Sequence, residues 1–417
     1  MKISALISSK HTRTFLSFGA MQAMQLLIPL LAFPWLSRKL GEDAFGVLMY
    51  MCLTPPIICL VMEWGIALGG ARKAARSRGD SVALSRLWGD ALAAKIILAV
   101  ACVAGSALFA PLIPRALTYP APYFLAALLG VIRGISPLWF YQGVGEGVKK
   151  MAVWDVLSSV AALSLIFLFI NEPDDWPLYF GITAGCKAVA YISLNIELCL
   201  RYRPSVRLAG GFHILKQTRT LFASSLFALI YNNGSQLVLG YFLTATEMGL
   251  IVAVVKMLRA VSALLNPFVQ TMFPELCLLN ELDQAKARSI LRRSLLGLFL
   301  LMSLCSCLLF VLAPYIISIA LGPGYEAATD VFRIVIFAAP PMACEFILGT
   351  QTLTPRGLEK RQTRVQAVVA CASLAMAVVL GGFFGLAGAA WLPPLIELAL
   401  VAGYFRVIAK YCPDAIL

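Results

Sequence analysis

The sequence has little charge and almost no histidine. Asp, Glu, Lys and Arg together make up 13% of its 417 residues, and it contains 2 His. Soluble globular proteins carry about 25% charged residues. Hydrophobic residues reach 60%, so the composition excludes an ordinary soluble domain and indicates a chain that lies largely within a membrane.

The sequence also lacks the residues that metal and nucleotide chemistry need. His11 and His213 both fall in predicted loops, and most of the 11 Cys lie inside apolar segments without a C-x-x-C spacing. This pattern favours neither a metal site nor a disulfide framework. The motif Gly143-x-Gly145-x-Gly147 lies in a predicted loop with no strand before it, and no Walker pattern occurs. We therefore expect no metal, no cofactor and no ATP hydrolysis on this chain.

Long hydrophobic runs fill most of the sequence. About 20 apolar residues cross a bilayer as a helix, so the runs predict an all-α polytopic membrane protein with about twelve transmembrane helices. The spans are expected at residues 14–36, 45–68, 87–110, 120–142, 152–171, 177–200, 219–242, 247–273, 295–320, 327–351, 365–384 and 387–409.

The chain repeats itself about halfway along. Leu40–Gly46, after the first span, resembles Leu243–Gly249 after the seventh, and a second pair of similar stretches follows the fourth and tenth spans. Internal repeats of this kind are common in secondary transporters, whose binding site lies between the repeats. The predicted domains are an N-terminal six-helix lobe (1–200), a cytoplasmic linker (201–220) and a C-terminal six-helix lobe (221–417).

Basic residues gather in alternate loops. The formal net charge is +13, and most of the 34 Lys and Arg lie on one side of the predicted spans, with Arg38, Lys39 and Arg115 on the other. Basic loops remain in the cytoplasm, so both termini are predicted to be cytoplasmic. This distribution explains the basic charge without a nucleic-acid partner. The opposite loops are short, which argues against a membrane enzyme with an outer catalytic domain.

Six basic residues interrupt the apolar spans. A Lys or Arg near the bilayer centre costs about 2.5–3.5 kcal/mol, so most of them must face acids or a water-filled cavity. Arg333 is near a span end and is expected to reach the surface, and for Lys95 both placements remain open. A cationic cavity in a membrane indicates an anionic substrate. The six residues are Lys95, Arg133, Lys187, Lys256, Arg259 and Arg333.

The seventh and eighth spans have the densest polar faces. The eighth span places two bases and two amides on one helix face, and Pro267 is expected to kink it. The seventh adds two amides four residues apart. Amides also form ordinary hydrogen bonds between membrane helices, so both interpretations remain open for them. The candidate substrate-binding residues here are Lys256, Arg259, Asn266, Gln270, Asn232 and Gln236.

Buried acids are fewer than buried bases. Glu63 and Glu345 are candidates for coupling transport to a proton or an ion. Asp155 is expected at the cytoplasmic interface, and Glu397, which follows two prolines, could partner another helix.

Three stretches of the sequence match motifs that are specific when they occur together. Pro34–Gly46 follows the pattern P-x-L-[AS]-R-x-L-G-x-x-x-[FY]-G, and Trp139–Gly143 follows W-x-[FY]-Q-G. Leu239–Gly249 and Lys256 follow a pattern with L-G, E-x-G and a later Lys. Together they resemble the Wzx-type polysaccharide flippases of the MOP exporter superfamily. Arg133 matches no motif of that family.

The resemblance implies a V-shaped, MATE-like fold of two lobes and a cavity lined by Glu63, Lys256 and Arg259. It implies a flippase, not an enzyme, that moves undecaprenyl-pyrophosphate-linked oligosaccharides to the periplasmic leaflet of the bacterial inner membrane. Membrane lipids, a polymerase and other polysaccharide-assembly proteins are the expected partners. Apart from the resemblance, the hypothesis is that Lys256 and Arg259 hold the pyrophosphate, with Arg133 and Lys187 as further candidates. Lys95 is another candidate substrate-binding residue, and the amides would contact sugars.

Two other functions remain open. A multidrug or cation antiporter of the same superfamily would need a cavity dominated by acids, whereas this chain has more buried bases. A membrane polysaccharide polymerase is disfavoured by the short outer loops.

Overall fold

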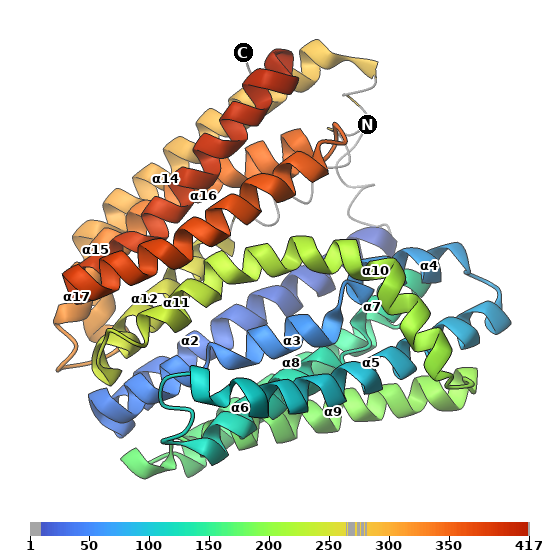
Figure 1. The fold of residues 1–417 in the computed structure, drawn as a ribbon, viewed down its shortest axis with the longest axis horizontal. Helices are drawn as coiled ribbons and strands as arrows, with labels where there is room; N and C mark the ends of the chain where they lie inside the picture. The colour runs from blue at the N-terminus through green and yellow to red at the C-terminus, as the bar shows by residue number, and fades with distance from the viewer. Residues whose placement is uncertain are drawn as a thin grey trace. The chain divides into compact units, whose positions relative to one another are not determined.

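The described part of the chain is built from helices (Figure 1). Every regular element within it is helical, which confirms the predicted all-α class. The chain divides into two compact units, Met1–Leu229 (unit 1) and Ile230–Leu417 (unit 2). The computed structural model describes residues 10–263, Leu265, Met272, Leu276, Leu279 and 282–415, and the side chains of all of these except 10–29, Ser224 and Ala415.

Unit 1 is a bundle of packed helices. Its main helices are α2 (Lys10–Met51), α3 (Thr54–Glu63), α4 (Ile66–Arg76), α5 (Ser81–Phe109), α6 (Pro120–Gly134), α7 (Leu138–Val144), α8 (Val148–Phe169), α9 (Leu178–Tyr202) and α10 (Leu208–Leu229). Helix α3 packs against α6, α10 against α5, and α8 against both α2 and α9. The carboxylate of Asp80 begins α5 by accepting hydrogen bonds from the backbone N–H groups of Val82 and Ala83.

Unit 2 contains both short, irregular helices and very long ones. Its main elements are a π-helical turn η3 (Ile230–Gly234), α11 (Ser235–Leu239), α12 (Ala245–Ala263), α14 (Gln284–Ala320), α15 (Ala327–Val335), α16 (Ala339–Phe346), a second π-helical segment η5 (Ile347–Leu353) and α17 (Glu359–Tyr411). Helix α17 contacts α11, α15, α16 and both π-helical segments. It is interrupted at Gly385, whose φ of 55° and ψ of −136° are not helical.

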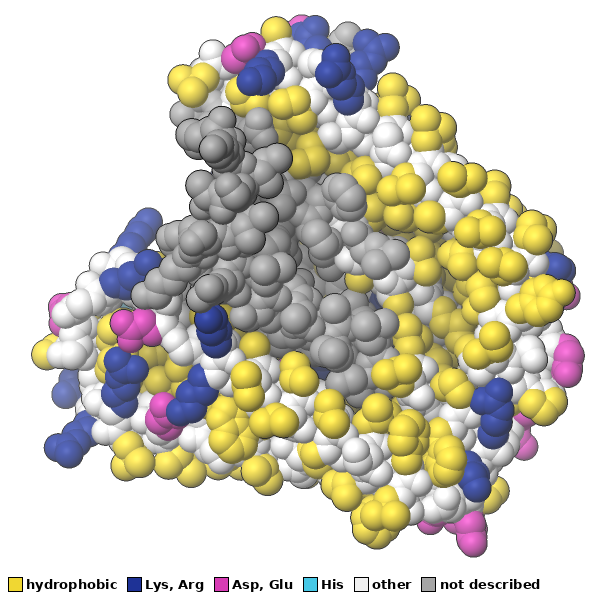
Figure 2. Space-filling model, turned by 180° about the vertical axis from the view of Figure 1, so that it is seen from behind, with side chains coloured by type: hydrophobic (Ala, Val, Ile, Leu, Met, Phe, Trp, Pro, Cys, Tyr) yellow, Lys and Arg dark blue, Asp and Glu magenta, His cyan; other side chains and the backbone are white. Residues whose placement is uncertain are grey.

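The chain is an integral membrane protein. Eight helical stretches among the described residues are long and apolar enough to cross a membrane. Helix α14, for example, exposes Leu300, Leu304, Leu308 and Val311 along one side. Figure 2 shows hydrophobic side chains over wide areas of the described surface on the visible face. A bilayer core is the solvent that suits such a surface. The predicted number of twelve spans stays a prediction.

The segment predicted as the lobe linker, 201–220, contains the end of α9 and the first part of α10. Helix α10 packs against α3, α4 and α5 within unit 1. Trp64, between α3 and α4, stacks on Phe222 of α10 with ring centroids 3.9 Å apart, and its indole N–H donates to the Leu215 carbonyl at 3.1 Å. The predicted lobe boundaries stay a prediction.

Helices α3 and α6 approach so closely that their contact requires glycine. A Cβ atom on Gly134 would lie 2.1 Å from the Cβ of Met62, and one on Gly130 would lie 2.6 Å from the Cβ of Ile58. Ile58 and Met62 belong to a buried hydrophobic cluster. This close contact therefore fixes the position of the C-terminal end of α6.

A buried ion pair joins α8 and α9. Lys187 Nζ lies 2.7 Å from Asp155 Oδ1 and also donates to Ser159 Oγ at 2.7 Å. The Tyr191 hydroxyl donates to the same Asp155 oxygen at 2.5 Å. Asp155 is completely buried, and its expected place at the cytoplasmic interface stays a prediction. The basic side chain that neutralises it comes from the neighbouring helix.

Gly134→Ala should destabilise unit 1, because the new methyl group would overlap Met62. Overpacking of this kind costs about 1–3 kcal/mol, measured as a lower thermal unfolding temperature of the full chain in detergent. Gly105→Ala on α5 is the matched control, since a Cβ there meets no atom within 4 Å. Equal effects of the two substitutions would contradict the close contact.

Lys187→Met should cost about 3–5 kcal/mol of stability, because Asp155 would remain as a buried carboxylate without its counter-charge. Lys187→Met combined with Asp155→Leu should recover most of that loss in the same unfolding assay. The exposed pair Lys150–Glu197, with side chains 47% and 43% exposed, provides the control. Lys150→Met should cost less than about 1 kcal/mol. Simple additivity in the double variant would show that the two buried charges do not compensate each other.

Candidate functional site

The π-helical turn η3 exposes a backbone carbonyl group. A π-helix bonds residue i to i+5, so carbonyl groups in it are displaced from the regular α-helical pattern. The carbonyl oxygen of Asn232 accepts hydrogen bonds from Arg259 Nη2 at 2.6 Å and from Gln236 Nε2 at 2.7 Å. The turn therefore provides an acceptor for a half-buried cation.

Arg259 reaches this turn from α12. Its Nη1 also lies 3.4 Å from Asn233 Oδ1, and its Nη2 lies 3.5 Å from Asn232 Oδ1. A guanidinium has five N–H donors in a planar fork. Nε and part of each terminal NH₂ group have no acceptor among the described residues. Arg259 is thus anchored but still able to bind an anion.

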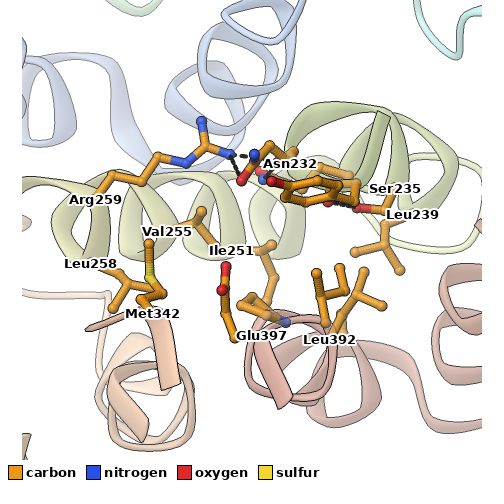
Figure 3. Close-up of a pocket in the computed structure, with 15 residues that line it drawn as sticks. Asn232, Ser235, Leu239, Ile251, Val255, Leu258, Arg259, Met342, Leu392 and Glu397 are labelled. Atoms are coloured by element: carbon orange, nitrogen blue, oxygen red, sulfur yellow. Dashed lines mark hydrogen bonds between the residues drawn. The ribbon is translucent and has the colours of Figure 1, made fainter. Parts of the chain in front are cut away.

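A small pocket lies beside Arg259 (Figure 3). Its cavity volume of about 30 Å³ has room for about two water molecules. Figure 3 shows the guanidinium directed at Asn232 and the Glu397 carboxylate directed into the pocket. Its polar lining residues are Tyr231, Asn232, Ser235, Gln236, Arg259 and Glu397, and its apolar ones include Leu239, Ile251, Val255, Leu258, Met342 and Leu392.

Two acids of unit 2 interact near this pocket. Glu397 is buried on α17 and makes no hydrogen bond within the described residues, but it interacts electrostatically with Arg259 and Glu345. Glu345, on α16, accepts a hydrogen bond from the Tyr404 hydroxyl at 3.4 Å. The two acids therefore interact electrostatically with each other and, through Glu397, with Arg259.

The structure brings together only some of the predicted site residues of unit 2. Asn232, Gln236 and Arg259 line the pocket. Lys256 is half-buried on α12, one turn before Arg259, and does not line it. Glu345 is linked to the pocket through Glu397. Asn266, Gln270 and the predicted kink at Pro267 lie outside the described residues.

The predicted basic residues of unit 1 differ in the partners that their charged groups have. Lys187 is held in its ion pair with Asp155. Lys95 is buried, donates to the carbonyl oxygen of Gly134 and interacts electrostatically with Glu63. Arg133 lies near the middle of the stretch Pro120–Val144 and is exposed. It makes no hydrogen bond or ion pair with any described residue.

Arg333 is partly exposed, in line with the expectation that its side chain reaches the surface. It lies 3.5 Å from Asp330, one turn earlier on α15, and its guanidinium lies over the ring of Phe310. A short ion pair on one helix and an aromatic neighbour satisfy this charge near the end of its helix.

Several residues of the site carry no strong sequence signal. Tyr231, Asn233 and Ser235 lie in or next to η3, and a π-helical turn has no spacing that distinguishes it from an α-helix. The sequence suggests Glu397 as a partner of another helix, whereas the structure shows it as a wall of the pocket. The Asn232–Gln236 spacing of four is the signal that places this segment in the candidate site.

Comparison with known proteins relates the chain to transporters. A relative from Escherichia coli (strain K12), named "Putative O-antigen transporter", is 25% identical over 91% of this chain and 92% of its own length. The lipid II flippase MurJ in an inward closed conformation has a TM-score of 0.73 at 11% identity, covering 96% of this chain and 90% of MurJ. An inward-facing multidrug resistance MATE transporter of the MOP superfamily has a TM-score of 0.67 at 13% identity, covering 94% and 95%.

The two structural similarities show a shared fold and no more, because the identities are low. The relative is named as a transporter, which agrees with the interpretation that this chain is not an enzyme. The sequence pattern of the family described as "Polysaccharide biosynthesis protein" matches residues 12–280, more than half of the chain. The chain therefore belongs to this family of polysaccharide biosynthesis proteins.

Proposed function

We propose that the chain is a flippase for undecaprenyl-pyrophosphate-linked oligosaccharides. It would move them from the cytoplasmic to the periplasmic leaflet of the bacterial inner membrane. The observation that carries the proposal is Arg259, a guanidinium in a membrane-embedded unit that is anchored on Asn232 and keeps unused donors. Membership of a polysaccharide family and a relative named as an O-antigen transporter support a glycan substrate.

Arg259, Lys256 and Arg133 are the proposed pyrophosphate ligands. A guanidinium binds phosphate oxygens in a fork, and a lysine does so as a point charge. Arg133 supports this role because an exposed charge near the middle of a span, without an ion pair or hydrogen bond to a described residue, favours water or an anion beside it. The pocket beside Arg259 is too small for a sugar in this conformation. The pyrophosphate would therefore bind the N–H donors of Arg259 that have no acceptor among the described residues.

Lys187 and Lys95 would contribute to substrate binding less directly than Arg259, Lys256 and Arg133. The charge of Lys187 is already balanced by Asp155, and Lys95 is occupied by the carbonyl oxygen of Gly134. Lys95 would hold the C-terminal end of α6, which carries Arg133, and Lys187 would hold α9, which packs against α6. The amides Asn232 and Gln236, with Asn266 and Gln270, remain the proposed sugar contacts.

Glu345 and Glu63 are the proposed coupling groups. Glu345 interacts with Glu397 and Tyr404, so taking up one proton would change the balance of charge around Arg259. Glu63 interacts electrostatically with Lys95. Protonation of either acid would favour one conformation of an alternating-access cycle over the other.

The topology and partners follow from the same proposal. Both termini would be cytoplasmic, as the basic loops predict. A polymerase and other polysaccharide-assembly membrane proteins would act on the glycan after its transfer.

Lys256→Ala combined with Arg259→Ala should abolish transfer, because both charges near the π-turn would be lost. The measurement is leaflet-resolved detection of undecaprenyl-linked glycan in cells that depend on this protein. Glycan should accumulate in the cytoplasmic leaflet, and Arg259→Lys alone should restore only part of the activity. Arg292→Ala, an exposed base on α14, is the control and should transfer normally. Normal transfer by the double variant would refute the pyrophosphate assignment.

Glu345→Gln should uncouple transfer from the driving gradient, because an amide cannot take up a proton. In the same assay, transfer by the wild-type protein should fall sharply when an uncoupler collapses the proton gradient. The residual transfer of Glu345→Gln should respond to the uncoupler several-fold less. Glu326→Gln, next to α15 and exposed, should behave like wild type. An unchanged uncoupler response of Glu345→Gln would assign coupling elsewhere, with Glu63→Gln as the next variant.

A further inference from the structure

A second, larger pocket opens at the end of unit 1 where α9 ends. Its volume is about 530 Å³. Three chain segments form it: the turn before α5 with the first residues of α5, the glycine-rich turn between α7 and α8, and the end of α9. Its polar lining residues are Ser81, Ser85, Glu146, Arg201, Tyr202 and Arg203.

The pocket presents donors suited to a phosphate group. Arg201 and Arg203 line it, and both are exposed. The hydroxyl groups of Ser81 and Ser85, one turn apart on α5, make no hydrogen bond within the described residues. One acid, Glu146, lies 3.3 Å from Arg201, in a pair whose side chains are both more than half exposed. An exposed pair of this kind is weak and can give way to an anion.

Arg203 occupies a backbone conformation that favours glycine. Its φ of 45° and ψ of 57° are left-handed, and its N–H caps α9 by donating to the Cys199 carbonyl at 2.8 Å. Glycine is the usual residue at such a cap because a side chain is unfavourable there. A strained residue that carries a guanidinium into a pocket points to a role for that guanidinium.

The walls of the pocket are held rigidly. Tyr202 packs edge-on against Phe140, which in turn packs on Trp88. Arg78 Nε donates to the carbonyl oxygen of Gly143 at 2.8 Å, so the glycine-rich turn is tied to the turn before α5. Such fixed walls make the arrangement a preformed site and not a chance gap between mobile loops.

An apolar stripe leads along α9 to the pocket. Val189, Ile192, Ile196 and Leu200 are all exposed and lie three or four residues apart, so they share one helix face. Arg201 follows directly after this stripe. An acyl chain lying along the stripe would bring its headgroup to Arg201 and Arg203.

We propose that this pocket binds the phosphate headgroup of an anionic phospholipid of the surrounding bilayer. Arg201 and Arg203 would hold the phosphate oxygens, Ser81 and Ser85 would donate hydrogen bonds, and an acyl chain would follow the α9 stripe. The glycine-rich motif would then form a wall of a lipid site. The site requires only a bilayer and a folded unit 1, so it does not depend on the proposed transport.

The test uses the full chain purified in neutral detergent and titrated with phosphatidylglycerol, phosphatidylcholine and inorganic phosphate. Native mass spectrometry counts the lipids retained, and thermal unfolding measures stabilisation. Phosphatidylglycerol should bind and stabilise the wild-type protein more than phosphatidylcholine does. Arg201→Gln and Arg203→Gly should each weaken phosphatidylglycerol binding by about fivefold, the factor expected for one interfacial basic residue.

Arg207→Gln, an exposed base outside the pocket, is the matched control and should bind the lipid like wild type. Arg203→Gly suits the left-handed cap, so it should fold at least as stably as wild type while losing the lipid. Unchanged phosphatidylglycerol binding by both pocket variants would overturn the proposal. Equal stabilisation by inorganic phosphate alone would also overturn it, because the site would then bind a soluble anion.

Discussion

A positive charge inside a membrane protein must find an acceptor, because the surrounding lipid offers none. Within the described residues this constraint is met in three ways. Lys187 pairs with a carboxylate, Asp155. Lys95 donates to the carbonyl oxygen of Gly134, at the C-terminal end of α6. Arg259 uses the carbonyl oxygen of Asn232, inside a π-helical turn. The positions of α6, α8, α9 and α12 are tied to these contacts.

Two of the three solutions depend on an irregular backbone. The last carbonyl groups of a helix have no partner within it, and a π-turn displaces carbonyl groups from the regular ladder. The irregular points in the helices are thus where cations can be held without a matching acid. A second π-segment, η5, directly follows α16 and Glu345, and the hydroxyl of Thr352 donates to the Ile347 carbonyl there at 2.9 Å. Both π-segments contact α17, which carries Glu397.

The degree to which each charge is satisfied separates structural from functional candidates. Lys187 and Asp155 are satisfied by hydrogen bonds and hold α8 against α9. Arg259 is only partly satisfied, and neither Arg133 nor Glu397 makes a hydrogen bond or ion pair with a described residue. Incompletely satisfied charges are costly to the resting structure and are the ones that a substrate or a proton can stabilise. Transport by alternating access needs groups of this kind, whose partners change during the cycle.

The sequence by itself determined the class of the molecule. Long apolar runs require membrane helices, and motifs such as Pro34–Gly46 are enough to indicate a family of polysaccharide biosynthesis proteins. It also located the polar segment around Asn232, Gln236 and Arg259, because helical spacing puts these residues on defined faces. Only the tertiary structure decided which charges neutralise each other. Lys187 and Asp155 are 32 residues apart, and no local period connects them. It also revealed the π-turn and the place of Glu397 in the pocket, because a backbone irregularity and a contact between distant helices arise from packing and leave no pattern in a single chain.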